Sequence, residues 1–138
     1  DVALPIGHSL AAHTTLSPED VVDERWVTSR EGLSPDDLIR AISAMTDRSI
    51  NIVHRVNDYG SVASVIAAGD AIGMVPRYTV GSTHSGLVLR PLAGITATRN
   101  IDLLTRPENL HRRSVQTVIV GLRAAMARLV EASGDTKN

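Results

Sequence analysis

The chain has 138 residues, which is enough for one domain with its own hydrophobic core but short for two complete domains. It has no cysteine, which excludes disulfides, thiolate nucleophiles and cysteine metal sites, and its 14 Lys and Arg against 15 Asp and Glu form no basic run for nucleic acid. No stretch has the character of a membrane span or a signal peptide. We therefore expect a cytoplasmic domain with no membrane partner.

The first strand-like run begins at once, without an initiator Met, so we expect that a further segment precedes this chain. Short runs rich in valine and isoleucine then alternate with segments of helical spacing, which is typical of an α/β sheet. We expect this sheet to be mostly parallel and flanked by helices. The expected strands cover residues 1–6, 25–29, 50–56, 71–76 and 87–92. Helices are expected to begin at Ser17, at Ser34 and at Asn57 or Asp58, where a side chain can cap the first turn.

The C-terminal part contains one more expected strand and the longest expected helix. Residues 99–106 (RNIDLLTR) have the composition of a strand, and residues from about 111 to 132 carry apolar side chains at helical spacing. The apolar stripe of this helix consists of Val115, Val118, Ile119, Leu122, Met126, Leu129 and Val130. A stripe of this length needs a packing partner.

Two glycines in the stretch VIAAGDAIGMVPR, residues 65–77, invite comparison with a phosphate-binding loop. In such a loop the glycines follow a strand and precede a helix, so that backbone amides face the anion. The order is reversed here, because Gly69 follows a helix and Gly73 lies inside the next strand. We therefore expect Gly69 to end the helix and Gly73 to allow close backbone packing.

The sequence contains no pattern of a catalytic or metal centre. No two histidines share a helical face beside a carboxylate; they are His8, His13, His54, His84 and His111. No Gly-x-Ser-x-Gly elbow is present. The acid pairs, Glu19 with Asp20 and Asp36 with Asp37, occupy first helical turns, where capping and the helix dipole explain them. We expect no enzyme activity, no metal and no cofactor, and keep an α/β enzyme as a rival interpretation.

Ligands of open parallel sheets gather beyond the carboxyl ends of the strands. Loops in this position are expected at residues 28–32, 57–60 and 76–82. The first two precede helix starts, whose unpaired amides suit a carboxylate or a similar anion. Thr28, Ser29 and Arg30 supply hydroxyls and a cation, although Arg30 could equally be a solvated surface residue.

Three stretches resemble the LysR-type transcriptional regulators. Residues 1–27 resemble the region in which a strand leads into a Gly-His-Pro-Leu-Ala motif, with Ser9 in place of the usual proline. Residues 62–77 (VASVIAAGDAIGMVPR) are similar to a Val-x-Ala-Gly-x-Gly-Ile-x-x-x-Pro signature, with Ala71 where a second glycine is common. Residues 88–106 (VLRPLAGITATRNIDLLTR), followed by one long helix, resemble the end of the family's sequences.

The resemblance implies an effector-binding domain with a periplasmic-binding-protein-like (type 2) fold, in which a small inducer binds between two α/β lobes. Residues 1–97 would form the second lobe, and residues 98–138 would return to the first lobe as a strand and the long helix. Most of the first lobe and the DNA-binding helix-turn-helix would be absent, so DNA would be contacted only through a segment outside this chain. The apolar stripe would then pack in an unusual way or against another copy in a homo-oligomer.

The resemblance also implies effector contacts in the second lobe. They would come from Thr28, Ser29, Arg30, Asn57, Asp58, Pro76 and Arg77. If Asp58 caps its own helix, it occupies the amides that an anionic inducer would use, which directs the anion toward the turn between Ser29 and Ser34. The alternative function is a fragment of a solute-binding protein of a transport system.

Overall fold

The structure is a computed structural model that describes residues 1–80 and 86–132. The chain forms two compact units, residues 1–98 and residues 99–138. The candidate site lies in the first unit.

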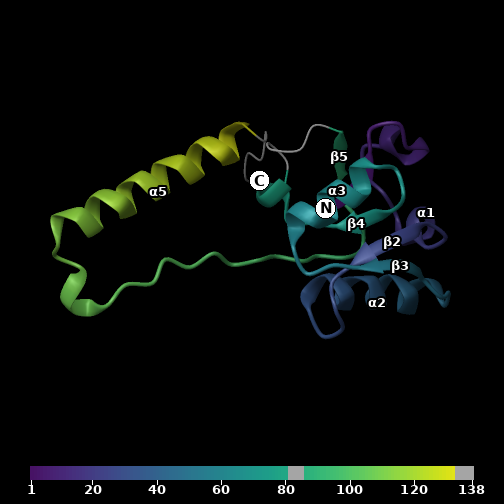
Figure 1. The fold of residues 1–138 in the computed structure, drawn as a ribbon, viewed down its shortest axis with the longest axis horizontal. Helices are drawn as coiled ribbons and strands as arrows, with labels where there is room; N and C mark the ends of the chain where they lie inside the picture. The colour runs from purple at the N-terminus through teal and green to yellow at the C-terminus, as the bar shows by residue number, and fades with distance from the viewer. Residues whose placement is uncertain (81–85, 133–138) are drawn as a thin grey trace. The chain divides into compact units, whose positions relative to one another are not determined.

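The first unit is built on a five-stranded sheet (Figure 1). Its strands, in the order β3-β2-β4-β1-β5, are β1 (Val2–Pro5), β2 (Arg25–Thr28), β3 (Asn51–Arg55), β4 (Ile72–Met74) and β5 (Leu87–Arg90). β2 pairs in parallel with β3 and β4, whereas β1 pairs antiparallel with β4 and β5. The sheet is therefore mixed rather than mostly parallel. A helix connects β2 to β3 and another connects β3 to β4, so these three strands run in the same direction. β1 lies between β4 and β5 and runs in the opposite direction.

The helices of this unit begin at local capping signals. They are η1 (Ser9–Ala12), α1 (Pro18–Val21), α2 (Ser34–Thr46), α3 (Tyr59–Ala67) and α4 (Arg77–Val80). At α1, the Ser17 Oγ accepts from the amide of Asp20 at 3.2 Å, and the Asp20 carboxylate accepts from the amide of Ser17 at 2.7 Å. This reciprocal capping box confirms the predicted start of α1.

The expected cap at Ser34 is wrong. Leu33 is the cap residue of α2, Ser34 is already helical, and no side chain caps this helix. The reason is that the amides of Asp36 and Asp37 donate to the carbonyl of Leu33, at 2.9 and 3.1 Å, which starts the helix one residue earlier.

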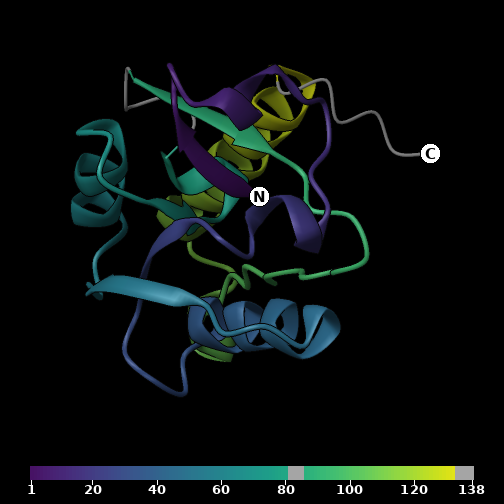
Figure 2. The ribbon, with the colours of Figure 1, turned by 90° about the vertical axis from the view of Figure 1, so that its right-hand side faces the viewer.

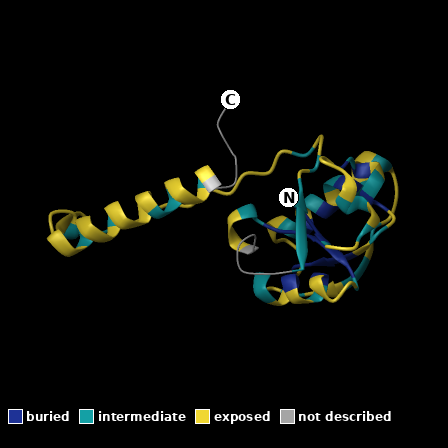
Figure 3. Ribbon diagram, turned by 90° about the horizontal axis from the view of Figure 1, so that it is seen from above, coloured by how far each residue is buried: buried dark blue, intermediate teal, exposed yellow. Residues whose placement is uncertain are grey.

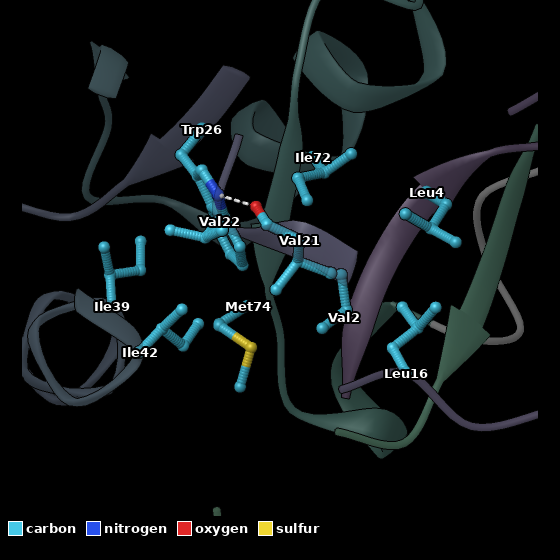
Figure 4. Packing of buried hydrophobic residues seen from close by; sticks show 10 residues of the cluster. All are labelled: Val2, Leu4, Leu16, Val21, Val22, Trp26, Ile39, Ile42, Ile72 and Met74. Atoms are coloured by element: carbon cyan, nitrogen blue, oxygen red, sulfur yellow. Dashed lines mark hydrogen bonds between the residues drawn. The ribbon is translucent and has the colours of Figure 1, made fainter. Parts of the chain in front are cut away.

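Helices lie on both faces of the sheet (Figure 2), and each face carries an apolar cluster. The cluster under α1 and α2 consists of Val2, Leu4, Leu16, Val21, Val22, Trp26, Ile39, Ile42, Ile72 and Met74 (Figure 4). The cluster under α3 consists of Ala3, Val27, Val62, Ala63, Ile66, Ala71 and Val75. Trp26 is fully buried in the first cluster, and its indole Nε1 donates to the carbonyl of Val21 at 2.9 Å. Helices on both faces make this unit a three-layer α/β structure.

Gly69 and Gly73 have the structural roles predicted from the sequence. Gly69 follows α3 with a φ of +85°, a left-handed conformation that favours glycine. Gly73 lies inside β4, where an added Cβ would be 3.0 Å from the carbonyl oxygen of Val27 and 3.1 Å from the side chain of Ile66. Neither glycine precedes a helix in the way that a phosphate-binding loop requires.

We expect Gly73→Ala to lower the free energy of unfolding by about 1 to 3 kcal/mol, because the added methyl overpacks the contact between β4, β2 and α3. Urea unfolding followed by circular dichroism measures the change. Gly7→Ala is the matched control, because nothing lies within 4 Å of a Cβ added there. Equal stability of the two variants would contradict the close approach at Gly73.

The second unit contains η2 (Pro107–Asn109) and the long helix α5 (Arg113–Ala132). α5 confirms the predicted long helix, but the strand expected at residues 99–106 is wrong, because no strand among the described residues pairs with them. Within this unit, no described side chain from residue 99 to 131 is buried (Figure 3). Val118, Leu122 and Leu129 of the apolar stripe are exposed. None of the helices described is long and apolar enough to cross a membrane.

Candidate functional site

One edge of the sheet collects the segments that the sequence selected for ligand binding. β2, β3 and β4 are parallel, so their carboxyl ends meet at this edge, and β1, which is antiparallel to β4, begins there. The amide of Val56 donates to the carbonyl of Thr28 at 2.7 Å, and the amide of Val75 donates to the carbonyl of Asp1 at 3.0 Å. We refer to this region as the carboxyl edge.

Thr28, Ser29, Arg30 and Asn57 lie together at the carboxyl edge. The amide of Arg30 donates to Asn57 Oδ1 at 3.0 Å, which joins the loop after β2 to the turn after β3. Thr28 and Ser29 are buried, with 2% and 6% of their surfaces exposed. The Thr28 hydroxyl is buried without a hydrogen-bond partner among the described residues. Because successive strand residues alternate between faces, Thr28 lies on the same face of β2 as Trp26, the face that α2 covers.

Arg30 provides a cation at this edge. The residue is exposed, and its guanidinium forms no hydrogen bond or ion pair within the part of the chain that the structure describes. Only its backbone amide is held, by Asn57. Its charge is therefore available to an anion that approaches the loop.

Asp58 caps its own helix, as the sequence suggested. Its Oδ1 accepts from the amide of Ser61 at 2.8 Å and from the Ser61 hydroxyl at 3.0 Å. These hydrogen bonds hold the pKa of Asp58 below its usual value, and the one from the Ser61 amide has the larger effect. A carboxylate thus covers the N-terminus of α3, while no side chain caps α2. The first turn of α2 contains Asp36 and Asp37, so carboxylates lie near the starts of both helices.

Pro76 and Arg77 follow β4 at the same edge. The Nε of Arg77 donates to Asp1 Oδ2 at 2.7 Å, and its Nη2 donates to Asp1 Oδ1 at 2.9 Å. This forked pair neutralises the Arg77 charge with a carboxylate that the sequence analysis did not select. Of the two arginines predicted for the site, Arg77 is therefore paired with an acid, whereas Arg30 has no acid partner among the residues that the structure describes.

A buried ion pair behind the loop was also missed. Asp36, in the first turn of α2, is 2% exposed and accepts from Arg55 Nη1 through Oδ1 at 2.7 Å. Its Oδ2 accepts from Arg40, with the Nε at 2.9 Å and the Nη2 at 2.5 Å. Hydrogen bonds hold the pKa of Asp36 below its usual value, and the one from Arg55 has a larger effect than the one from Arg40. Burial of the carboxylate acts in the opposite direction and raises the pKa.

The first-turn position of Asp36 suggested a capping role, but this carboxylate forms ion pairs instead of a cap. The spacing of four residues between Asp36 and Arg40 was a local signal for an ion pair. The partnership with Arg55 lies 19 residues away and has no local signal.

Two of the described histidines lie beside carboxylates. His8 Nε2 lies 3.5 Å from a carboxylate oxygen of Glu24, and His54 Nε2 lies 2.6 Å from Asp70 Oδ2. His84 lies outside the described residues. Within residues 1–80 and 86–132, no three His, Asp or Glu side chains gather as metal ligands. The donors that do gather at the carboxyl edge are hydroxyls, amides and the guanidinium groups of Arg30, Arg55 and Arg77, which suit a small polar or anionic molecule.

Comparison with known proteins agrees with this architecture. The LysR substrate binding domain family matches residues 1–127. The comparison with curated proteins gives no match. Among solved structures, the LysR family transcriptional regulator HinK from Pseudomonas aeruginosa has a TM-score of 0.60 at 18% identity, over 79% of this chain and 41% of that chain.

Two further structures were determined with small molecules. The BenM effector binding domain with its effector benzoate has a TM-score of 0.58 at 19% identity, over 99% of this chain and 61% of that one. The regulatory domain of Synechocystis CcmR in complex with 2-PG has a TM-score of 0.59 at 15% identity, over 67% of this chain and 45% of that one. The chain thus spans only part of each of these structures. With the family match over most of its length and the periplasmic-binding-protein-like fold of these domains, the chain belongs to the LysR substrate binding domain family.

Proposed function

We propose that this chain is the effector-sensing part of a bacterial LysR-type transcription regulator and that a small anionic effector binds at the carboxyl edge. The observation that carries the proposal is the cluster of Thr28, Ser29, Arg30 and Asn57, joined by the hydrogen bond from the Arg30 amide to Asn57. This cluster combines a buried unpartnered hydroxyl with a guanidinium that has no partner among the described residues.

The anion would bind in the turn between Ser29 and Ser34. Arg30 supplies the positive charge in this turn, and the charge of Asp36 in the first turn of α2 is balanced by Arg55 and Arg40. Asp58, in contrast, places a carboxylate directly on the first amides of α3. Asn57 and Asp58 would border the effector, with Asn57 offering its amide NH2 and Asp58 excluding a second anionic group. Pro76 and Arg77 would form the rim beside β4, with Arg77 held by Asp1.

Effector binding would act on transcription by shifting the populations of two arrangements of the regulator. The residues proposed to contact effector lie in only one of the expected lobes, residues 1–97. Residues 98–138 would return to the other lobe, and a DNA-binding segment and a homo-oligomer would belong to the complete cytoplasmic regulator. The comparisons give no support to a transport protein. The proposed role of these residues is binding, with no catalytic step.

The site is tested by titrating the chain with sodium benzoate, shikimate and sodium phosphate, with calorimetry and amide resonances as readouts. We expect Arg30→Ala to weaken the best-binding probe about 10- to 100-fold, because one charge-assisted contact contributes about 1.5 to 3 kcal/mol. Ser29→Ala should weaken it about three- to tenfold, through loss of a neutral hydrogen bond.

Matched variants away from the edge control for unspecific effects. Arg48→Ala removes an exposed arginine that pairs with Asp23 beyond the far end of α2, and Ser64→Ala removes an exposed hydroxyl on α3. Both should bind the probe as the unchanged chain does. Unchanged affinity in both Arg30→Ala and Ser29→Ala, or no binding of any of the three probes, would overturn the assignment of this edge as the effector site.

A further inference from the structure

A single peptide group in the candidate site is held on both of its sides. The carbonyl of Ser29 and the amide of Arg30 belong to the same planar peptide. Arg55 Nη1 donates to that carbonyl at 2.8 Å, and Asn57 Oδ1 accepts from that amide at 3.0 Å. Both holding side chains come from the end of β3 and the turn after it. The orientation of this peptide directs the side chains of Ser29 and Arg30.

Arg55 is itself fixed by Asp36. The Nη1 nitrogen has two hydrogens, and it donates one hydrogen bond to the Ser29 carbonyl and another, at 2.7 Å, to Asp36 Oδ1. Asp36 is almost fully buried, and Arg40 occupies its other oxygen at 2.9 Å, so this carboxylate is ordered on both sides. The Arg55 side chain is 37% exposed, which leaves its outer edge at the surface while its inner nitrogen reaches the buried acid.

This arrangement connects three segments that are far apart in sequence: the end of β3, the loop after β2 and the first turn of α2. Without the guanidinium, the Ser29 carbonyl would lose this donor, and Asp36 would retain Arg40 alone. The peptide would then be held only from the Asn57 side, and it could rotate about its flanking bonds. The loop would still be tethered at the carbonyl of Thr28, which accepts from the amide of Val56 at 2.7 Å.

We infer that Arg55 is a positioning residue for the effector site: held by the buried Asp36, it fixes the Ser29–Arg30 peptide so that the contacts of Ser29 and Arg30 are preorganised. The inference rests on the proposed function, because it assigns Arg55 a role in effector affinity without contact to the effector. A preorganised loop loses less conformational freedom on binding, so affinity depends on the clamp as well as on the contacting side chains.

Hydrogen exchange tests the clamp in the chain without added ligand. Arg55→Met should speed the exchange of the Arg30 amide about tenfold, while the amide of Ile66, inside α3, keeps its protection. Arg55→Lys should restore most of the protection, because an ammonium can still donate to both the Ser29 carbonyl and Asp36. Arg25→Met is the matched control, because it removes an Arg–Asp pair, with Asp70 at 2.8 Å, from the other end of β2.

Binding of sodium benzoate to the same variants tests the consequence for affinity. We expect Arg55→Met to raise the benzoate Kd about tenfold, Arg55→Lys to remain within about threefold of the unchanged chain, and Arg25→Met to leave it unchanged. If Arg55→Met does not fold, Arg55→Gln replaces it, since glutamine keeps part of the stem and a neutral donor. Rescue by lysine separates positioning from a general loss of stability.

The outcomes separate this inference from the proposed site. Faster exchange at Arg30 alone, together with weaker benzoate binding, supports the positioning role. Equal exchange and equal Kd in Arg55→Met and Arg25→Met would overturn it, even if Arg30→Ala abolishes binding and the site itself stands. Faster exchange at Arg30 and Ile66 alike would also overturn it, because Arg55 would then stabilise the whole unit. If Arg30→Ala and Ser29→Ala leave the Kd unchanged, the proposed site fails, whatever the exchange of the Arg30 amide.

Discussion

Trp26→Ala is expected to lower the free energy of unfolding by about 3 to 5 kcal/mol, a large part of the 5 to 15 kcal/mol typical of a domain. The indole is fully buried between the sheet and the helices α1 and α2, so its removal leaves a large cavity. The carbonyl of Val21 also loses its donor at 2.9 Å. Urea unfolding followed by far-UV circular dichroism measures the change, because Trp26 is the single tryptophan and its fluorescence disappears with it.

Trp26→Phe gives an intermediate case. Phenylalanine keeps a six-membered aromatic ring but loses both the N–H donor and the volume of the five-membered ring, so we expect a smaller cost of about 1 to 3 kcal/mol. The damage should extend to ligand binding, because Thr28 lies two residues further along the same face of β2. A Trp26→Ala variant as stable as Trp26→Phe would show that the first cluster does not depend on this ring.

Asp36→Asn is expected to lower the free energy of unfolding by about 2 to 3 kcal/mol at pH 7, because it leaves Arg55 and Arg40 without their shared counter-charge. The pH dependence has a defined sign. The pKa of Asp36 is lower in the folded chain than in the unfolded chain, so its stabilisation is complete above the unfolded value of about 4 and is lost as the pH falls through the folded value.

Urea unfolding of both chains between pH 7 and pH 2 measures this dependence. The difference in the free energy of unfolding between the unchanged chain and Asp36→Asn should shrink below about pH 4. Asp37→Asn serves as the control, since Asp37 is the neighbouring, exposed carboxylate of the same turn and forms no ion pair among the residues that the structure describes. A difference that stays constant down to pH 2 would contradict the ion pairs of Asp36.

Local signals in the sequence determined the order of the main elements in the first unit and the starts of α1 and α3. The caps at Ser17 and Asp58, the left-handed Gly69 and the valine-rich strands act within a few residues of one another, so their physics can be read along the chain. The long helix α5 was equally readable, from its 3.6-residue period. The spacing of whole motifs was also enough to indicate the family.

Only the tertiary structure decided how these elements combine. The antiparallel direction of β1, the absence of a strand at residues 99–106 and the pairing of Arg77 with Asp1 depend on which segments meet in space. The same holds for Asp36, whose first-turn position suggested a cap until Arg55 was found beside it. The Asp36–Arg55 and Asp1–Arg77 pairs join residues 19 and 76 positions apart, and neither periodicity nor local propensity carries information over such distances.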